Sequence, residues 1–281
     1  MRILRFLLLV LFLITSVVFG VDRFYSYRDR DDIAPVISCD RDEIVLSVRD
    51  SETELLKGVS AVDDHDGDVT STIVVAGKSN FIDDGVIRVS YAAFDSHNNV
   101  GSYSRKVTYS DYRSPRFMSN KPLVLRSGNN HDYSFLQAED VLSGDISPKI
   151  KIMTAFDDST PGECIVNLEV TNDYGDISKL ELMLDVYGTA EYNRMHPALT
   201  EYIVYVPVGE KIDLSSYLTG IWKGDEYLTF EEAEIDPAFI YTDDDLVNYD
   251  EPGVYSAFYY LPIDRNTTTE TRLLVIVAED H

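Results

Sequence analysis

Residues 61–100 read AVDDHDGDVTSTIVVAGKSNFIDDGVIRVSYAAFDSHNNV, and this stretch decides the fold. In its right half the residues that alternate onto one face are apolar, with more polar residues between them. A period of two is typical of a strand with one buried face, and such a sheet needs a second sheet to cover it. Turns about every 8 to 12 residues between such runs indicate a sandwich. We therefore predict an all-β protein of immunoglobulin-like β-sandwiches rather than an α/β fold. The residues predicted to face inward are Ile87, Val89, Tyr91 and Ala93.

The same pattern recurs 77 positions later without a gap, so the stretch is a repeat unit. In the second copy Cys164 and Val166 take the inward positions of Ile87 and Val89. A third, more diverged copy begins near Tyr202. The corresponding positions are Ala61 and Ala138, Gly67-Asp68 and Gly144-Asp145, Gly85 and Gly162, and, in the third copy, Gly224-Asp225 and Gly253.

The repeat register predicts three small domains in the 281 residues. The first connection is short and holds Pro115, so the first two domains should be stiffly joined. The connection before the third domain is longer and polar, and we expect a hinge there. The expected segments are 1–21 as signal anchor or signal peptide, 22–34 as juxtamembrane stalk, 35–111 as the first domain, 115–187 as the second, 188–201 as linker and 202–281 as the third.

The N-terminus carries an uncharged apolar run, residues 6–21, preceded by Arg2 and Arg5. Positive charge before such a run favours a cytoplasmic N-terminus, which places the domains outside the cell. The run is intermediate in length between a signal-peptide core and a spanning helix of roughly 20 residues. A poor cleavage site and the aromatic residues of 24–27 favour a retained single-pass membrane anchor. A cleaved signal and a secreted protein remain the alternative.

These turns and strands resemble a known family, the bacterial Ig-like domains found in tandem on cell-surface proteins, which also occur in a pesticidal crystal toxin and are related to the hyaline repeat. The family pattern is a Gly-Val, an Ala-x-Asp, an Asp-Gly-Asp-Val-Thr turn, a Gly-Thr-Tyr-x-Val-x-Tyr strand and an Asp-x-x-Gly-Asn turn. The resemblance is strong for residues 35–110, fair for 115–187 and weak for 197–279. It implies an Ig-like fold and a surface setting, and it implies no chemistry. The matching segments are Gly58-Val59 and residues 61–63, 66–70, 85–91 and 95–99.

Composition excludes some functions. With 49 acidic against 24 basic residues, the formal net charge is −25, and there is no basic stripe to bind a nucleic acid. The five histidines are scattered without a catalytic or metal-binding spacing, and no nucleophile elbow or phosphate-binding loop occurs. We expect no catalytic residues, no cofactor and no enzyme activity.

The acidic turn of the first repeat is the strongest candidate for a metal site, because clustered carboxylates suit calcium. It lacks the EF-hand pattern, and the second repeat has fewer acidic residues at this turn. The Gly-Asp pair persists in all three copies, which favours a turn in which Gly takes a positive φ and Asp bonds nearby backbone. We therefore predict no metal, with calcium as the alternative. The calcium candidates are Asp63, Asp64, Asp66 and Asp68.

Any ligand site is expected on the third domain, farthest from an N-terminal anchor. This domain holds the only tryptophan, Trp222, followed by Tyr227 and Phe230, and aromatics of this kind anchor interfaces. Trp222 as a core residue is the alternative. Cys39 and Cys164 fall in different repeats, so we expect two buried, reduced thiols.

Three hypotheses for function follow. The first is a non-enzymatic, membrane-anchored extracellular protein that acts as a stalk or as a binding module for an unknown protein or glycan. The second is a calcium-dependent adhesion module. The third is a cell-envelope carbohydrate-active enzyme with its site in the third domain.

Overall fold

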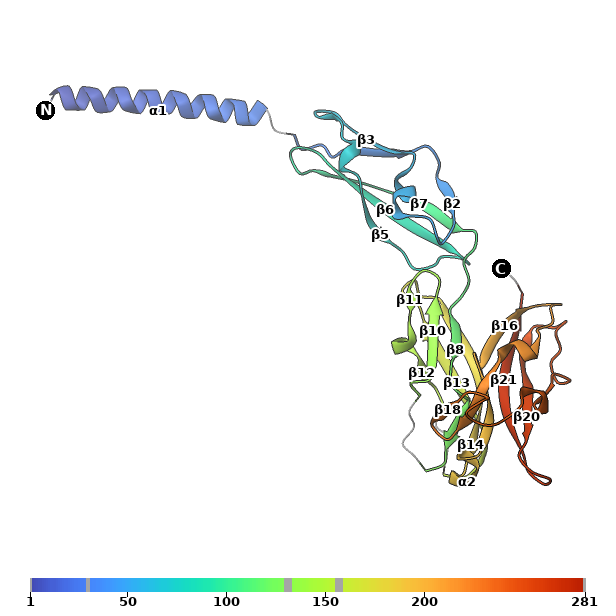
Figure 1. The fold of residues 1–281 in the computed structure, drawn as a ribbon. Helices are drawn as coiled ribbons and strands as arrows, with labels where there is room; N and C mark the ends of the chain where they lie inside the picture. Colours follow the sequence, from blue (N-terminus) through green and yellow to red (C-terminus); the bar gives the residue numbers. More distant parts are fainter. Residues whose placement is uncertain (1, 29–30, 129–132, 155–158, 280–281) are drawn as a thin grey trace. The chain divides into compact units, whose positions relative to one another are not determined.

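The computed structural model describes residues 2–28, 31–128, 133–154 and 159–279. Within these ranges it has an N-terminal helix followed by six β-sheets (Figure 1). The chain forms two compact units, Met1–Ser110 and Asp111–His281.

The N-terminal helix, α1, runs from Arg2–Arg28. Its segment Arg5–Phe24 has 20 residues and a mean hydropathy of 2.2, and none of it is buried within the described chain. This length and composition suit either a membrane span or a signal sequence. The side chains of Arg2, Tyr25 and Tyr27 lie outside the described residues, so the arguments that rest on them stay predictions.

The first unit holds one β-sandwich. One sheet has three antiparallel strands, and the other has four, in which β2 and β7 are parallel. The predicted alternation is confirmed, since Ile87, Val89, Tyr91 and Ala93 are all 0% exposed. The sheets, in strand order, are β1 (Val36–Cys39), β3 (Val59–Asp63), β4 (Gly67–Asp68) and β2 (Glu43–Leu46), β7 (Val100–Tyr109), β6 (Val86–Phe94), β5 (Val74–Lys78), with 3-10 helices η1 (Glu52–Leu56) and η2 (Thr70–Thr72).

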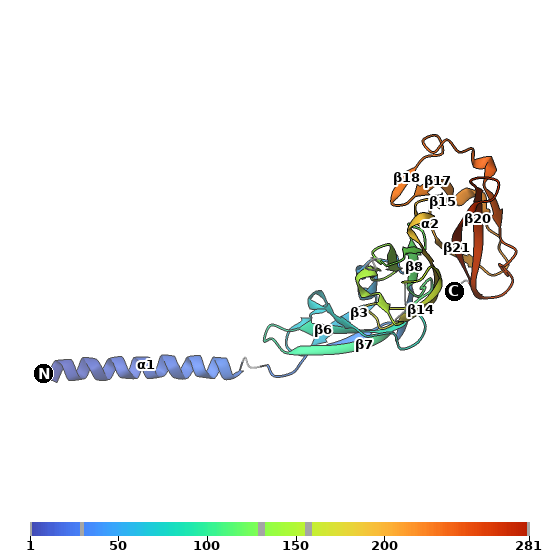
Figure 2. The same cartoon turned by 90° about the horizontal axis from the view of Figure 1, so that it is seen from below.

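The second unit repeats this strand order twice, which gives two more sandwiches. In the second domain the sheets are β8 (Arg116–Ser119), β10 (Leu136–Asp140), β11 (Gly144–Asp145) and β9 (Val124–Arg126), β14 (Ile177–Tyr187), β13 (Gly162–Thr171), β12 (Lys151–Ile152), with η3 (Ser147–Lys149). In the third they are β15 (Met195–Leu199), β17 (Leu218–Lys223), β18 (Glu226–Leu228) and β16 (Ile203–Pro207), β21 (Thr268–Ala278), β20 (Gly253–Pro262), β19 (Tyr241–Asp243), with α2 (Thr189–Tyr192), η4 (Leu214–Tyr217) and η5 (Pro237–Phe239). Figure 2 shows β15, β17 and β18 together in the third domain.

The segment expected as a linker needs correction. Residues 195–199 form β15, which pairs with β17 and is buried from His196 onward. The polar residues before this strand, and His196 within it, made the segment look like a linker. His196 is buried, and its two ring nitrogens lie near backbone carbonyl oxygens, those of Glu191 (2.9 Å) and Glu270 (3.1 Å).

The second and third domains are also joined by more than a hinge. One hydrophobic cluster runs through both, from Phe117 to Val277. At its edge Arg272 of β21 is 6% exposed and binds Asp185 of β14 at 3.0 Å and Glu163 of β13 at 2.5 Å. Burial raises the pKa of Asp185. A buried ion pair that joins two sandwiches fixes how they pack.

The turn prediction is confirmed in the first two copies. Gly67 and Gly144 have φ of 75° and 70°, and the following Asp68 and Asp145 accept hydrogen bonds from the backbone N–H two residues on, at 2.9 Å. In the third copy, the prediction that Gly224-Asp225 corresponds to Gly67-Asp68 is wrong. Gly224-Asp225 forms the hairpin turn between β17 and β18, where the first domain has residues 64–66.

Cys39 and Cys164 are not joined by a disulfide bond. Each is only partly buried rather than fully buried. Cys164 packs against the core cluster, and burial raises the pKa of Cys39.

Candidate functional site

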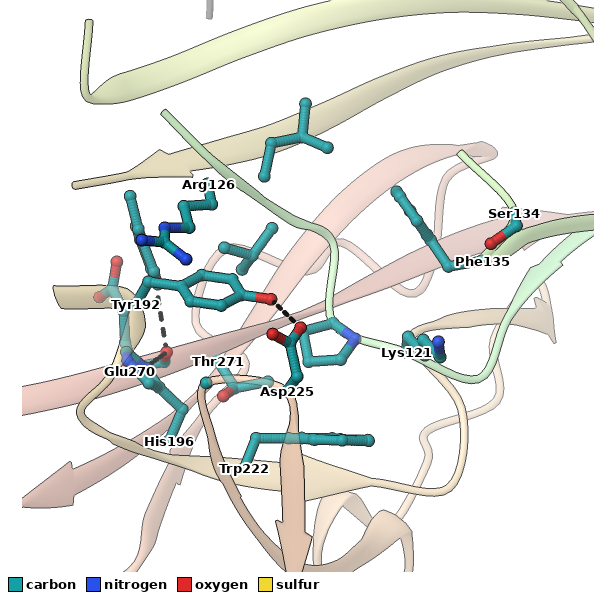
Figure 3. Close-up of a pocket in the computed structure, with 15 residues that line it drawn as sticks. Lys121, Arg126, Ser134, Phe135, Tyr192, His196, Trp222, Asp225, Glu270 and Thr271 are labelled. Carbon is teal, nitrogen blue, oxygen red and sulfur yellow. Dashed lines mark hydrogen bonds between the residues drawn. The ribbon is translucent and has the colours of Figure 1, made fainter. Parts of the chain in front are cut away.

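A cavity of about 290 Å³ lies between the second and third domains (Figure 3). The second domain contributes side chains near β9, among them Lys121, Arg126 and Phe135. The third contributes Trp222 of β17 and Asp225 of the following turn. This volume is at the lower end of the range of about 300–1,000 Å³ that small-molecule sites span.

Trp222 is one of the aromatic residues that line this cavity. Its indole Nε1 donates a hydrogen bond to the hydroxyl of Tyr202 (2.8 Å), and Tyr202 is 0% exposed. The Tyr227 ring packs edge-on against it, with ring centroids 5.6 Å apart. Because two contacts fix the indole, Trp222 presents a rigid apolar surface, and little side-chain entropy is left to lose on binding.

Polar groups lie opposite the tryptophan. The Tyr192 hydroxyl donates to Asp225 Oδ1 (2.8 Å), as Figure 3 shows. Burial, followed by this hydrogen bond, raises the pKa of Tyr192 to about 12, so its hydroxyl stays a donor at neutral pH. Asp225 is exposed, and its second oxygen remains able to accept a further hydrogen bond.

His196 lines the same cavity but is held by the fold. Its ring stacks on Tyr187 with centroids 5.2 Å apart, and its two nitrogens face the carbonyl oxygens of Glu191 and Glu270. A ring held in this way joins β15 to β21.

A second cavity, of about 510 Å³, lies between the same two domains. Arg116 and Tyr205 line it, and the guanidinium lies over the ring at 4.7 Å from its centroid. The Tyr205 hydroxyl also accepts the backbone N–H of Phe117 at 2.9 Å. These contacts serve the packing of the two domains.

The three predicted ligand residues therefore do not lie together in one site. Trp222 lines the cavity, and Tyr227 contacts Trp222 from outside the lining. Phe230 is partly buried against the hydrophobic core. The residues contributed by the second domain were missed, because no local pattern predicts a cavity formed between two domains.

The four calcium candidates also have different environments and do not form one site together. Asp64 is exposed. Asp66 accepts from the backbone N–H of Ser96 (2.6 Å), and Asp68 accepts from that of Thr70 (2.9 Å), and these bonds lower the pKa of both carboxyls. Only Asp63 is buried, at 3% exposed. It lies within 4.8 Å of two carboxylates that sequence reasoning missed, Asp31 and Asp95, so these three residues could hold a metal ion.

Comparison with known proteins gives limited similarity. No protein-family model matches the chain. The chain is 27% identical over 134 residues to pesticidal crystal protein Cry22Aa of Bacillus thuringiensis, a match that covers 46% of this chain and 18% of that protein.

Solved structures give similarities at low sequence identity. Drosophila N-cadherin EC1-3 is 15% identical with a TM-score of 0.31, covering 89% of this chain and 91% of that one. The CBM51-2 and INT domains of Clostridium perfringens ZmpB, a structure in complex with GlcNAc, are 15% identical with a TM-score of 0.23, covering 55% and 42%. The strand pairing described above gives the fold class, which is all-β, with tandem immunoglobulin-like β-sandwiches after an N-terminal apolar helix.

Proposed function

We propose that the chain is a non-enzymatic cell-surface binding module, held to the membrane by α1, that binds a glycan in the cavity beside Trp222. The observation that carries the proposal is a fixed indole that lines one cavity together with the Tyr192–Asp225 pair of its own domain and Lys121 of the second domain. A sugar ring presents apolar C–H groups on its face and hydroxyls at its edge. Trp222 suits the face, and Asp225 and Lys121 suit the hydroxyls.

The anchor is supported by the length of α1. A segment of 20 residues with a mean hydropathy of 2.2 is long enough to cross the hydrocarbon core of roughly 30 Å. A net charge of −25 keeps the rest of the chain soluble and away from anionic surfaces.

The proposal of binding without turnover concerns the two carboxyl groups that line the cavity, those of Asp225 and Glu270. Asp225 accepts a hydrogen bond from Tyr192, and burial raises the pKa of Glu270. A hydrolase of glycans needs two carboxyl groups placed on either side of the bond to be cleaved. The test of the proposal therefore includes the fate of the bound glycan.

The test uses the full chain in detergent micelles on an array of glycans, with Trp222 as the reporter. Because the sequence has a single tryptophan, a ligand in the cavity should change its fluorescence directly. Asp225→Asn and Trp222→Phe should each weaken binding by about tenfold or more, the size of a lost anchor contact. Mass spectrometry should recover the bound glycan unchanged.

Phe239→Ala is the matched control, because Phe239 is 68% exposed on the third domain and lies outside the cavity lining. It should leave the affinity unchanged. Binding that survives both cavity variants would place the site elsewhere, and a hydrolysed glycan would refute the non-enzymatic part of the proposal.

A further inference from the structure

Three carboxylates converge at one end of the first sandwich. Asp31 precedes β1, Asp63 ends β3, and Asp95 follows β6. One carboxylate oxygen from each lies within 4.8 Å of the others. The three residues are 9%, 3% and 8% exposed, respectively, so the cluster is shielded from water.

One oxygen of each carboxylate orders the local backbone. Asp63 Oδ1 accepts from the N–H groups of His65 and Asp66 at 2.9 Å. Asp31 Oδ1 accepts from the backbone N–H of Ile33 at 2.9 Å. Asp95 Oδ1 accepts from the backbone N–H groups of His97 and Asn99, both at 2.8 Å. These bonds fix the orientation of all three side chains before any ligand arrives.

The second oxygens are not all satisfied. Asp95 Oδ2 accepts from the side-chain amide of Asn99 at 2.7 Å. Asp31 Oδ2 and Asp63 Oδ2 are buried and have no hydrogen-bond partner. Among the residues that the structure describes, none of the three carboxylates is paired with Lys or Arg. Buried carboxylates are normally paired or coordinate a metal, so this arrangement calls for a cation.

We propose that Asp31, Asp63 and Asp95 bind a calcium ion. Calcium takes oxygen ligands at about 2.3–2.6 Å, so oxygens on opposite sides of one ion lie up to about 5 Å apart, as the spacing here allows. Three carboxylates leave further positions for carbonyl oxygens or water, which calcium accepts in its flexible shell of 6–8 ligands.

A zinc site is the nearest rival, because Asp31 also lies within reach of His65 and His97. The geometry favours calcium over it. The two imidazole rings pack edge-on against each other, with centroids 5.4 Å apart. The Nδ1 of His97 lies 3.2 Å from Ser96 Oγ, whereas the oxygens without partners belong to Asp31 and Asp63.

The site has a structural consequence for the chain. Asp31 comes three residues after Arg28, the last residue of α1. Its own carbonyl oxygen also accepts from Asn99 Nδ2 at 3.0 Å. A calcium ion held by Asp31 would therefore fasten the segment that leaves α1 to the loops of the first sandwich. This inference is independent of the glycan proposal.

The test is hydrogen exchange measured by mass spectrometry on the full chain in detergent micelles, in EGTA and then in CaCl2, MgCl2 or ZnCl2. The reporters are the amides that donate to the three carboxylates, those of Ile33, His65, Asp66, His97 and Asn99. Extracellular calcium modules have a Kd on the order of 10⁻⁴–10⁻³ M. At about 10 mM CaCl2, exchange through opening should slow by about 10–100-fold.

Asp63→Asn is the main variant, because its Oδ1 still accepts the two loop amides while the charge is removed. It should abolish the calcium response. Asp140→Asn, the same change at the corresponding position of the second domain, is the matched control and should keep the response. If Asp63→Asn does not fold, Asp95→Asn replaces it, because the second domain folds with Asn172 at that position.

Two results would overturn the proposal. One is equal exchange of the reporter amides in EGTA and CaCl2. The other is protection by ZnCl2 without protection by CaCl2, which would assign the site to His65 and His97 instead.

Discussion

The first and second domains share a fold and a repeat register, but they bury different polar side chains at corresponding positions. In the first, Asp63 lies beside Asp95, and its Oδ2 is buried without a hydrogen-bond partner. In the second, Asn172 takes the place of Asp95, and its amide donates to Asp140 Oδ2 at 3.1 Å. The same amide donates to the Tyr112 hydroxyl at 3.0 Å, and that hydroxyl donates to Asp176 Oδ2 at 2.6 Å. The second cluster thus has hydrogen-bond donors, the Asn172 amide and the Tyr112 hydroxyl, where the first cluster has buried carboxylate oxygens without a partner.

The cores of the two domains also differ in how many polar groups they bury. Arg105 is 1% exposed in the first domain, with its guanidinium bonded to Tyr91 Oη at 2.8 Å and to the carbonyl oxygen of Lys57 at 3.1 Å. The corresponding residues of the second domain are Leu168 and Leu182, both buried. The first domain therefore depends on polar groups that the second replaces with hydrocarbon, and substitutions should affect the two differently.

The largest effect is expected for Arg105→Ala. It empties a buried volume and leaves carbonyl oxygens unpaired, which should lower the free energy of unfolding of the first domain by about 3–5 kcal/mol. Denaturation followed by circular dichroism should show this loss, while the Trp222 fluorescence transition, which reports residues 111–281, should not move. Arg105→Leu imitates the second domain. A variant as stable as the original protein would mean that the polar network adds no stability.

The second effect concerns Asn172→Asp. This change puts a second carboxylate beside buried Asp140 and removes the donor that satisfies it, which should destabilise the second unit by about 2–3 kcal/mol. Here the Trp222 transition should move to lower denaturant and the first unit should not respond. Asn167→Asp, at an exposed position of β13, the strand that precedes Asn172, is the control. An unchanged Trp222 transition would contradict the assigned role of the amide.

The smallest effect is the pH dependence of the shared turns. Hydrogen bonds from Thr70 hold the pKa of Asp68 below its usual value, and those from Ser147 do the same for Asp145. The unfolded chain therefore takes up these protons first as the pH falls. The stability from both turns is present above the ordinary Asp pKa of about 3.9 and is lost as the pH falls below it.

The two units should not respond equally to acid. In the second unit burial raises the pKa of Asp185, so its protonation favours the folded state and opposes the loss from Asp145. Thermal melts at about pH 5 and pH 3 should therefore show the larger loss in the first unit. Asp68→Asn should flatten the response of the first unit alone. A first unit that becomes more stable in acid would contradict this account.

The strands and the repeat were predictable because they follow local patterns. The run 86–94 was expected and is β6, and the Gly-Asp turns have the expected positive φ. The acidic cluster was not predictable. Asp31, Asp63 and Asp95 lie on three separate segments, and only the pairing of β1 with β3 and the packing of the two sheets bring such positions together.

Two other features escaped sequence reasoning for the same physical reason. His196 reads as a polar linker residue, yet it is buried by contacts with residues as distant as Glu270. Arg105 carries a charge, which is normally exposed, and only Leu55, Lys57 and Tyr91 together satisfy its guanidinium inside the core. Polar residues reveal their burial only when long-range partners are known.

The parallel strand pair found in each sandwich determines how the protein responds to tension. β2 pairs with β7, β9 with β14, and β16 with β21, so in every domain the second strand lies parallel to the last. Pulling a domain from its two ends slides these strands along each other. The hydrogen bonds of an evenly spaced parallel pair then carry the load together and must break together, rather than opening one after another. A chain that tethers a ligand to a surface would therefore yield at high force, one sandwich at a time.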